Sequence, residues 1–227
     1  MRIRSFIIAY ALVLALLLFA DRRPGPKQPD RYSHVVDLTD GQTTTAPQAT
    51  SIESRTRILA PATLIPGTWT AGQIPPERLV APLVVMDLNR LPEGSPQISL
   101  DDIAAWEAQH GAIPQGAVIA IRRTDSHDTL STNDLSTAPF PIARDAALFL
   151  VDARYAIGFA FEVNTPVNLA ADRTLARQLA LHGSYVLEEA ARFTSLPATG
   201  SLIIVAPAKT MIKKPGAAPV RILAMVR

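Results

Sequence analysis

Side chains that could carry chemistry are few and widely spaced in this sequence of 227 residues. There is no cysteine, which excludes disulfides, thiolate zinc sites and a cysteine nucleophile. No H-E-x-x-H motif, glycine-rich phosphate loop or G-x-S-x-G elbow occurs. His127 lies between Asp125 and Asp128 but has no second histidine nearby, so a solvated loop is the better interpretation than a metal cluster. The remaining histidines are His34 on a predicted strand and, before glycines at predicted helix ends, His110 and His182.

The most informative stretch runs from Glu53 to Pro76, ESRTRILAPATLIPGTWTAGQIPP. It resembles the signature of the metal-dependent cyclase family, which includes the kynurenine formamidases. In that family the signature is H-x-G-T-H-x-D-A-P-x-H, followed by a loop that ends in Ile-Pro. Thr56 keeps the signature threonine, and the rest of the frame is kept by Ala60-Pro61 and Ile74-Pro75.

The resemblance implies a particular chemistry, and the sequence lacks most of its residues. Members bind one or two divalent metals, often zinc or manganese, and a metal-bound water attacks an amide or a cyclic ester. Lowering the pKa of that water takes a cation held by several ligands, which one carboxylate cannot provide. Of the family ligand positions only Glu188 matches; the others are occupied by Glu53, Arg57, Leu59, Thr63 and Ala176. No cofactor is therefore expected.

The degenerate pocket predicted by this comparison contains Glu53, Arg57, Thr63 and Glu188. We expect the Arg57 guanidinium to stand in for the missing cation and to pair with Glu188, because a lone buried carboxylate would be costly. The alternative is that Arg57 points to solvent and Glu188 is an ordinary carboxylate. Catalytic residues are not identified by the sequence.

The elements that must position these residues are strands and helices without strict alternation. Apolar runs predict strands, and amphipathic segments with Ser99 and Asp102 as a capping box predict helices. The predicted strands are 32–39, 79–88, 117–121, 155–163, 202–206 and 220–226; the predicted helices are 99–110, 141–153 and 169–181, while 184–191 starts extended and then turns helical. This mixture predicts an α/β (mixed α+β) domain. The resemblance, which extends over most of 32–227, implies a single cyclase-like domain whose mixed sheet or barrel-like β core is flanked by helices.

The N-terminus carries Arg2 and Arg4 before an uninterrupted apolar run, within residues 5–20. This pattern predicts a hydrophobic helix that serves as a signal peptide or a short signal-anchor, residues 1–21. A proline-rich linker follows, residues 22–31, ahead of the cyclase-like domain. The protein is therefore expected to be anchored to a membrane or exported. The two arginines account for the net charge of +2, and no basic cluster predicts nucleic-acid binding.

Two functions remain compatible with the sequence. One is a membrane-tethered relative that has lost catalysis and binds a ligand or partner through the old pocket. The other is an active arylformamidase-type hydrolase with a rebuilt metal site, for example from His34, Asp40 and Glu53 with Glu188. Only the second requires zinc or manganese. A homodimer is implied by the resemblance alone, and the small-molecule or protein ligand is not defined.

Overall fold

A computed structural model describes residues 32–40, 55–88, 97–122, 140–162, 173–209 and 216–227. The chain separates into two units, Met1–Tyr32 and Ser33–Arg227. The predicted signal and linker, Glu53 and the loop around His127 lie outside the described residues. Within the described ranges, no helix has the length and apolar character needed to cross a membrane.

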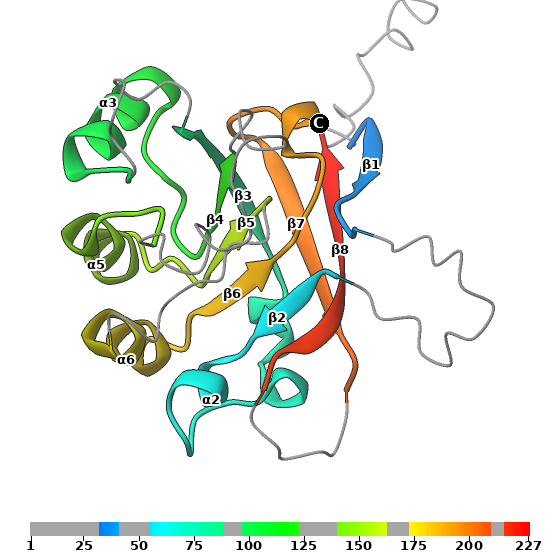
Figure 1. Cartoon of the computed structure of the whole chain (residues 1–227). Coiled ribbons are helices and arrows are strands. Elements are labelled where there is room, and N and C mark those ends of the chain that lie inside the picture. Colours follow the sequence, from blue (N-terminus) through cyan, green and yellow to red (C-terminus); the bar gives the residue numbers. More distant parts are fainter. Residues whose placement is uncertain (1–31, 41–54, 89–96, 123–139, 163–172, 210–215) are drawn as a thin grey trace, which may run out of the picture. The chain divides into compact units, whose positions relative to one another are not determined.

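The domain is built on a closed β-sheet (Figure 1). Across the described strands, a ring forms because β8 pairs with β2 on one side and with β7 on the other. A further strand, β1 (His34–Asp37), pairs antiparallel with the second half of β8. In ring order the strands are β2 (Arg57–Leu59), β6 (Tyr185–Glu188), β5 (Gly158–Phe161), β4 (Val118–Arg122), β3 (Val80–Asp87), β7 (Ser201–Pro207) and β8 (Ala218–Val226).

Strands β3, β4, β5 and β6 are parallel, and three helices cover their outer face (Figure 1). The helices are α3 (Leu100–His110), α5 (Arg144–Ala153) and α6 (Arg173–Leu181). Because both faces of these strands are buried, their sequences are almost continuously apolar. Helix α3 begins at the predicted capping box, where the Ser99 amide donates to Asp102 and the Asp102 amide donates to Ser99. The described residues also form one short α-helix, α2 (Pro61–Leu64), and three 3-10 helices: η1 (Ala71–Gln73), η2 (Pro76–Arg78) and η5 (Phe193–Ser195).

Alternation along the strands divides the apolar residues into two cores. Ile58, Leu187 and Tyr185 belong to the core inside the ring. Leu59 and Val186 pack on the outer core, between the sheet and the helices. The inner core requires a glycine at position 158, since a Cβ there would lie 2.5 Å from the Tyr185 ring.

The fold class is confirmed, including the barrel-like β core and its flanking helices. The sequence did not predict β2, because a strand of three residues is too short to show a period. The prediction that the chain turns helical within 184–191 is wrong: Glu189 has a φ of 52° and ends β6, and a 3-10 turn forms only at Phe193–Ser195.

Candidate functional site

The signature segment forms β2, and the register of this strand decides which of its side chains meet. Arg57 lies opposite Glu188, and Leu59 lies opposite Val186. Directly opposed residues of antiparallel strands have Cβ atoms about 4.5–5.5 Å apart on the same face. Ile58 points into the inner core, so Arg57 and Glu188 share the outer face with Leu59. The structure thus brings together the two charged residues that the sequence singled out, while their ion pair stays a prediction.

Thr56 precedes β2 and ties three distant segments together. Its side chain is fully buried. Its hydroxyl accepts a hydrogen bond from the Asp40 amide at 2.7 Å and donates one to the Glu189 carbonyl oxygen at 2.7 Å. The threonine that keeps the signature frame therefore holds the ends of β1 and β6 beside β2.

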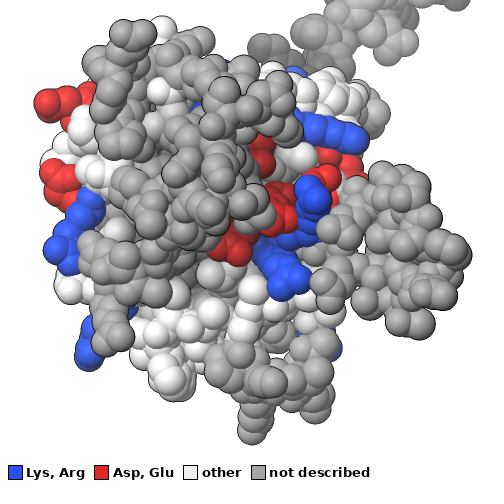
Figure 2. Space-filling view, in the orientation of Figure 1, with Lys and Arg blue, Asp and Glu red and all other residues white. Residues whose placement is uncertain are grey.

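Charged groups of both signs surround this junction. Asp40 lies 3.9 Å from the guanidinium of Arg55. Burial raises the pKa of the Glu189 carboxyl, and the neighbouring Asp40 adds to this, while Arg55 and Arg57 oppose it. Figure 2 shows acidic and basic side chains gathered next to one another on this face of the domain. The result is a polar network of mixed charge rather than a concentration of carboxylates.

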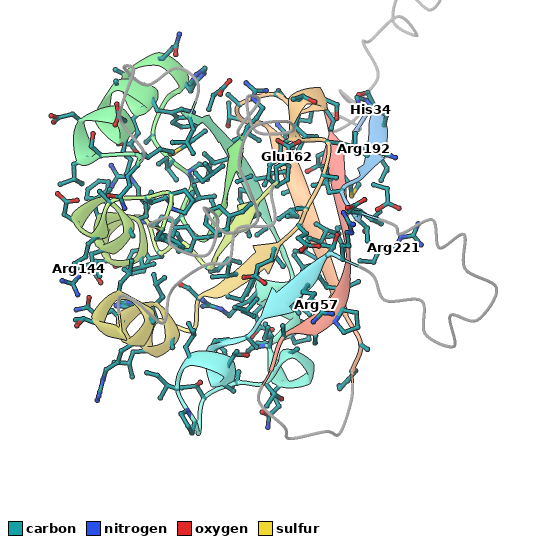
Figure 3. The ribbon with its side chains drawn as sticks, in the orientation of Figure 1. His34, Arg57, Arg144, Glu162, Arg192 and Arg221 are labelled. Atoms are coloured by element: carbon teal, nitrogen blue, oxygen red, sulfur yellow. The ribbon has the colours of Figure 1, made fainter. Side chains whose placement is uncertain are left out.

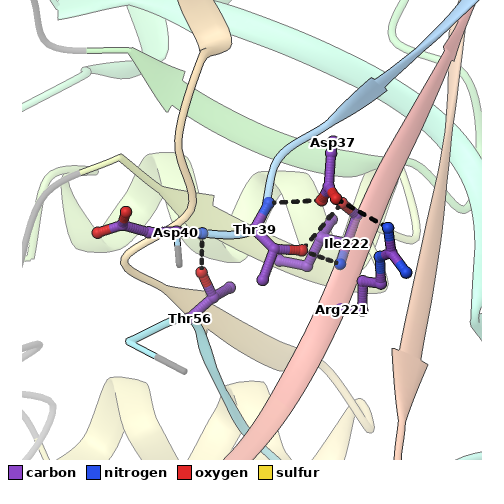
Figure 4. Close-up of polar contacts among 6 residues, drawn as sticks. All are labelled: Asp37, Thr39, Asp40, Thr56, Arg221 and Ile222. Atoms are coloured by element: carbon purple, nitrogen blue, oxygen red, sulfur yellow. Dashed lines mark hydrogen bonds and ion pairs between the residues drawn. The ribbon is translucent and has the colours of Figure 1, made fainter. Parts of the chain in front are cut away.

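Asp37 extends the network along β1 and β8 (Figure 4). Its carboxylate accepts hydrogen bonds from the Thr39 amide at 3.1 Å and from Arg221 at 3.1 Å. Burial raises the pKa of Asp37, but the bonds from Thr39 and the charge of Arg221 outweigh it, so the pKa is lowered overall. The Thr39 hydroxyl in turn accepts from the Ile222 amide at 3.0 Å. Asp37 is therefore engaged in joining β1 to β8.

The other positions matched to family ligands hold groups that do not suit a cation. Leu59 and Ala176 both pack against the outer core, Ala176 from α6. The Thr63 hydroxyl donates to the Gly216 carbonyl oxygen at 3.2 Å. Among the described residues there is no group of three or more His, Asp or Glu side chains placed to hold a metal ion. The side chains of this part of the structure do not fit the family metal.

His34 does not join Glu188, contrary to the arrangement suggested for a rebuilt site. It lies opposite Val226, whereas Arg57 lies opposite Pro219 near the start of the same strand. At about 3.3 Å per residue these positions are about 23 Å apart along β8. Figure 3 shows His34 and Arg57 at opposite ends of this strand. His182 also lies elsewhere, with its Nε2 3.0 Å from the Asp152 carboxylate.

Glu189 and Thr39 are two members of this network that the sequence did not identify, as are Arg55 and Arg221. Glu189 follows Glu188 directly and has no pattern of its own; its role depends on the left-handed backbone conformation that ends β6. Thr39 is one of many threonines in a polar region, and its contact with Ile222 spans 183 residues. No local signal in the sequence could have found either contact.

Comparison with known proteins agrees with the geometry of the barrel and the signature strand. The family model described as "Putative cyclase" matches residues 30–165, more than half of the chain. The protein therefore belongs to this cyclase family, as the signature frame predicted. No curated protein matches it.

Solved structures extend the likeness over most of the domain. Isatin hydrolase A from Ralstonia solanacearum is 25% identical, with a TM-score of 0.67, covering 86% of this chain and 92% of that one. A protein described as a "potential metal-dependent hydrolase with cyclase activity" is 25% identical, with a TM-score of 0.61, covering 86% of this chain and 98% of that one. Isatin hydrolase A from Labrenzia aggregata, bound to benzyl benzoate, is 24% identical, with a TM-score of 0.60, covering 90% and 89%, and shares the fold.

Proposed function

We propose that this protein is a cyclase-family member that has lost metal-dependent hydrolysis and acts by binding a ligand or partner. The observation that carries the proposal is the outer face of β2, where Arg57 and Leu59 occupy positions matched to metal ligands. Glu188 alone matches a ligand, and it lies opposite a cation. In this proposal, the guanidinium of Arg57 neutralises the charge of Glu188 in place of a metal.

The chemical groups at these positions decide whether a cation can bind there. A bound Zn²⁺ or Mn²⁺ needs several oxygen or nitrogen ligands with lone pairs to donate. A guanidinium has five donors, no acceptor and a permanent positive charge, so it opposes a second cation at the same place. Leucine and alanine supply no ligand atom. These residues favour a stable apolar and ion-paired surface over a cation site.

Membrane attachment belongs to the same proposal. The apolar run within residues 5–20 would hold the domain at a membrane as a signal-anchor, with residues 22–31 as a spacer. Self-association as a homodimer is the arrangement that the family resemblance suggests. The domain would then present its binding surface near the membrane.

The competing proposal is an active hydrolase of cyclic amides or esters. Its support is the 25% identity to isatin hydrolase A together with the retained Glu188. It would need ligands from outside the described residues, such as Glu53, because His34 is too far away. Hydrolysis of isatin and of formyl-aromatic amides tests it directly.

The deciding experiment measures metal content and hydrolysis together. The full-length chain, purified in detergent, is incubated with zinc and manganese, desalted and analysed by elemental mass spectrometry. The matched control restores the family residues with Glu53→His, Arg57→His, Leu59→Asp, Thr63→His and Ala176→His, its folding checked by circular dichroism. We expect no retained metal and no hydrolysis for the natural protein.

Restoration of about one ion per chain in the control variant would support loss of the ligands as the cause. Stoichiometric metal in the natural protein, or turnover of isatin, would overturn the proposal. The single variant Arg57→Gln keeps the reasoning testable if the restored variant does not fold. Because it removes the opposing charge and adds only one amide oxygen as a ligand, we expect it to remain free of metal.

A further inference from the structure

A pocket of about 350 Å³ lies away from the signature strand, between α3 and the carboxyl ends of β3 and β4. Around the ring, β6 and β5 separate it from β2 on one side, and β7 and β8 do so on the other. Pockets of about 300–1,000 Å³ are typical of small-molecule sites. The described residues that line it include Met86, Asp87, Asp102, Trp106, Arg122 and Leu196.

One wall of the pocket is apolar, and a hydrogen bond fixes the tryptophan ring in this wall. Met86 and Ile98 are buried in the outer core, and Leu196 is buried in the inner one. The Trp106 indole nitrogen donates to the Val85 carbonyl oxygen at 3.2 Å, which fixes the ring on β3. This wall suits an aliphatic or aromatic side chain of a ligand.

The other part is charged, and its hydrogen-bonding capacity is only partly used. Arg122 donates from Nε and Nη2 to a single oxygen of Asp87, at 3.1 and 2.6 Å. Its side chain is 20% exposed, and among the described residues it makes no other hydrogen bond. The N–H groups at Nη1 are therefore available to an acceptor in the pocket.

Asp102 provides the complementary group. One of its oxygens, Oδ2, accepts from the Ser99 amide at 2.8 Å and from the Ser99 hydroxyl at 2.5 Å. Its Oδ1 has no hydrogen-bond partner in the part of the chain that the structure describes. Among the described lining residues, Asp87 pairs with Arg122, and the carboxylate of Asp102 adds one negative charge. An anion alone would be repelled by Asp102, and a simple amine would leave the Nη1 N–H groups of Arg122 without an acceptor.

We propose that this pocket binds a small apolar α-amino acid. The carboxylate of the ligand accepts from Arg122, its ammonium group donates to Asp102, and its side chain lies against Trp106, Met86 and Leu196. A zwitterion meets both polar demands without adding net charge. This inference does not depend on the loss of the metal, because the pocket shares no residue with the signature strand.

Isothermal titration calorimetry of the full-length chain tests the proposal with L-leucine and L-phenylalanine. Two analogues test the polar contacts separately: phenylalanine amide lacks the carboxylate, and N-acetylphenylalanine lacks the ammonium. Ala105→Phe fills the pocket from the exposed surface of α3. Ala104→Phe is its matched control, on the neighbouring exposed position of the same helix that does not line the pocket.

We expect binding of at least one amino acid, with unchanged affinity in Ala104→Phe and at least about tenfold weaker affinity in Ala105→Phe. Each analogue loses a charge-assisted hydrogen bond and should bind about 10- to 100-fold more weakly. The double variant Asp87→Asn with Arg122→Gln keeps the pair neutral and should abolish the preference for the acid over its amide. Dissociation constants weaker than about 1 mM for both amino acids, or equal binding to the two phenylalanine variants, would overturn the proposal.

Discussion

Replacing Thr56 with valine should destabilise the domain more than any comparable change at a surface threonine. Valine preserves the shape of the fully buried side chain but removes its hydroxyl. Two hydrogen bonds of 2.7 Å disappear, leaving the Asp40 amide and the Glu189 carbonyl group without this partner. Unmade bonds to partly buried groups cost about 1–2 kcal/mol each, so we expect a loss of about 2–4 kcal/mol.

Urea unfolding followed by circular dichroism measures this loss, and thermal unfolding should show a fall in Tm of about 5–15 °C. Thr63→Val is the matched control, because the Thr63 hydroxyl makes one longer bond of 3.2 Å in a partly exposed place. It should cost less than about 1 kcal/mol. Thr56→Ser keeps the hydroxyl and should recover most of the stability. Equal effects of the two valine variants would refute the argument that Thr56 holds the junction of three strands together.

Two further predictions concern packing and pH. Gly158→Ala should lower the free energy of unfolding in urea by about 1–3 kcal/mol, because the added Cβ would lie 2.5 Å from the buried Tyr185 ring. Gly216→Ala is the control: its Cβ meets nothing within 4 Å, so the free energy of unfolding in urea should hardly change. The hydrogen bonds from Arg154 lower the pKa of Glu107 below its ordinary 4.5, so its stabilisation is present above that pH and is lost as the pH falls through the folded value. Glu107→Gln should therefore flatten the decline of stability in acid, and an unchanged decline would show that this ion pair does not contribute.

The polar contacts of Thr56 join three strands of the domain. In the described structure, β1, β2 and β6 meet through the Thr56 hydroxyl, with charges of both signs around it. Ion pairs at partly exposed sites contribute little individually, so the buried hydroxyl carries most of the predicted effect. Unfolding of Thr56→Val and the metal content of the purified chain therefore test the same junction by independent measurements.

The sequence by itself determined the class of the domain and its family frame. Apolar runs and the Ser99–Asp102 capping box act over a few residues, so the strands and the start of α3 could be predicted from local pattern. It also determined which side chains occupy the ligand positions, because the residue at each position is read directly from the sequence. Arg57 and Leu59 supply no lone pair for a metal under any arrangement of the chain.

Only the tertiary structure decided which of these residues meet. Closure of the ring depends on β8 pairing with both β2 and β7, and the opposition of Arg57 and Glu188 depends on a register across more than a hundred residues of chain. The Thr56 hydroxyl bonds partners 16 and 133 residues away. Such contacts are selected by packing of the whole core, since a strand of three residues carries no pattern that fixes its neighbours. The pocket beside α3 arises in the same way, from a helix face and two strand ends that only the folded chain brings together.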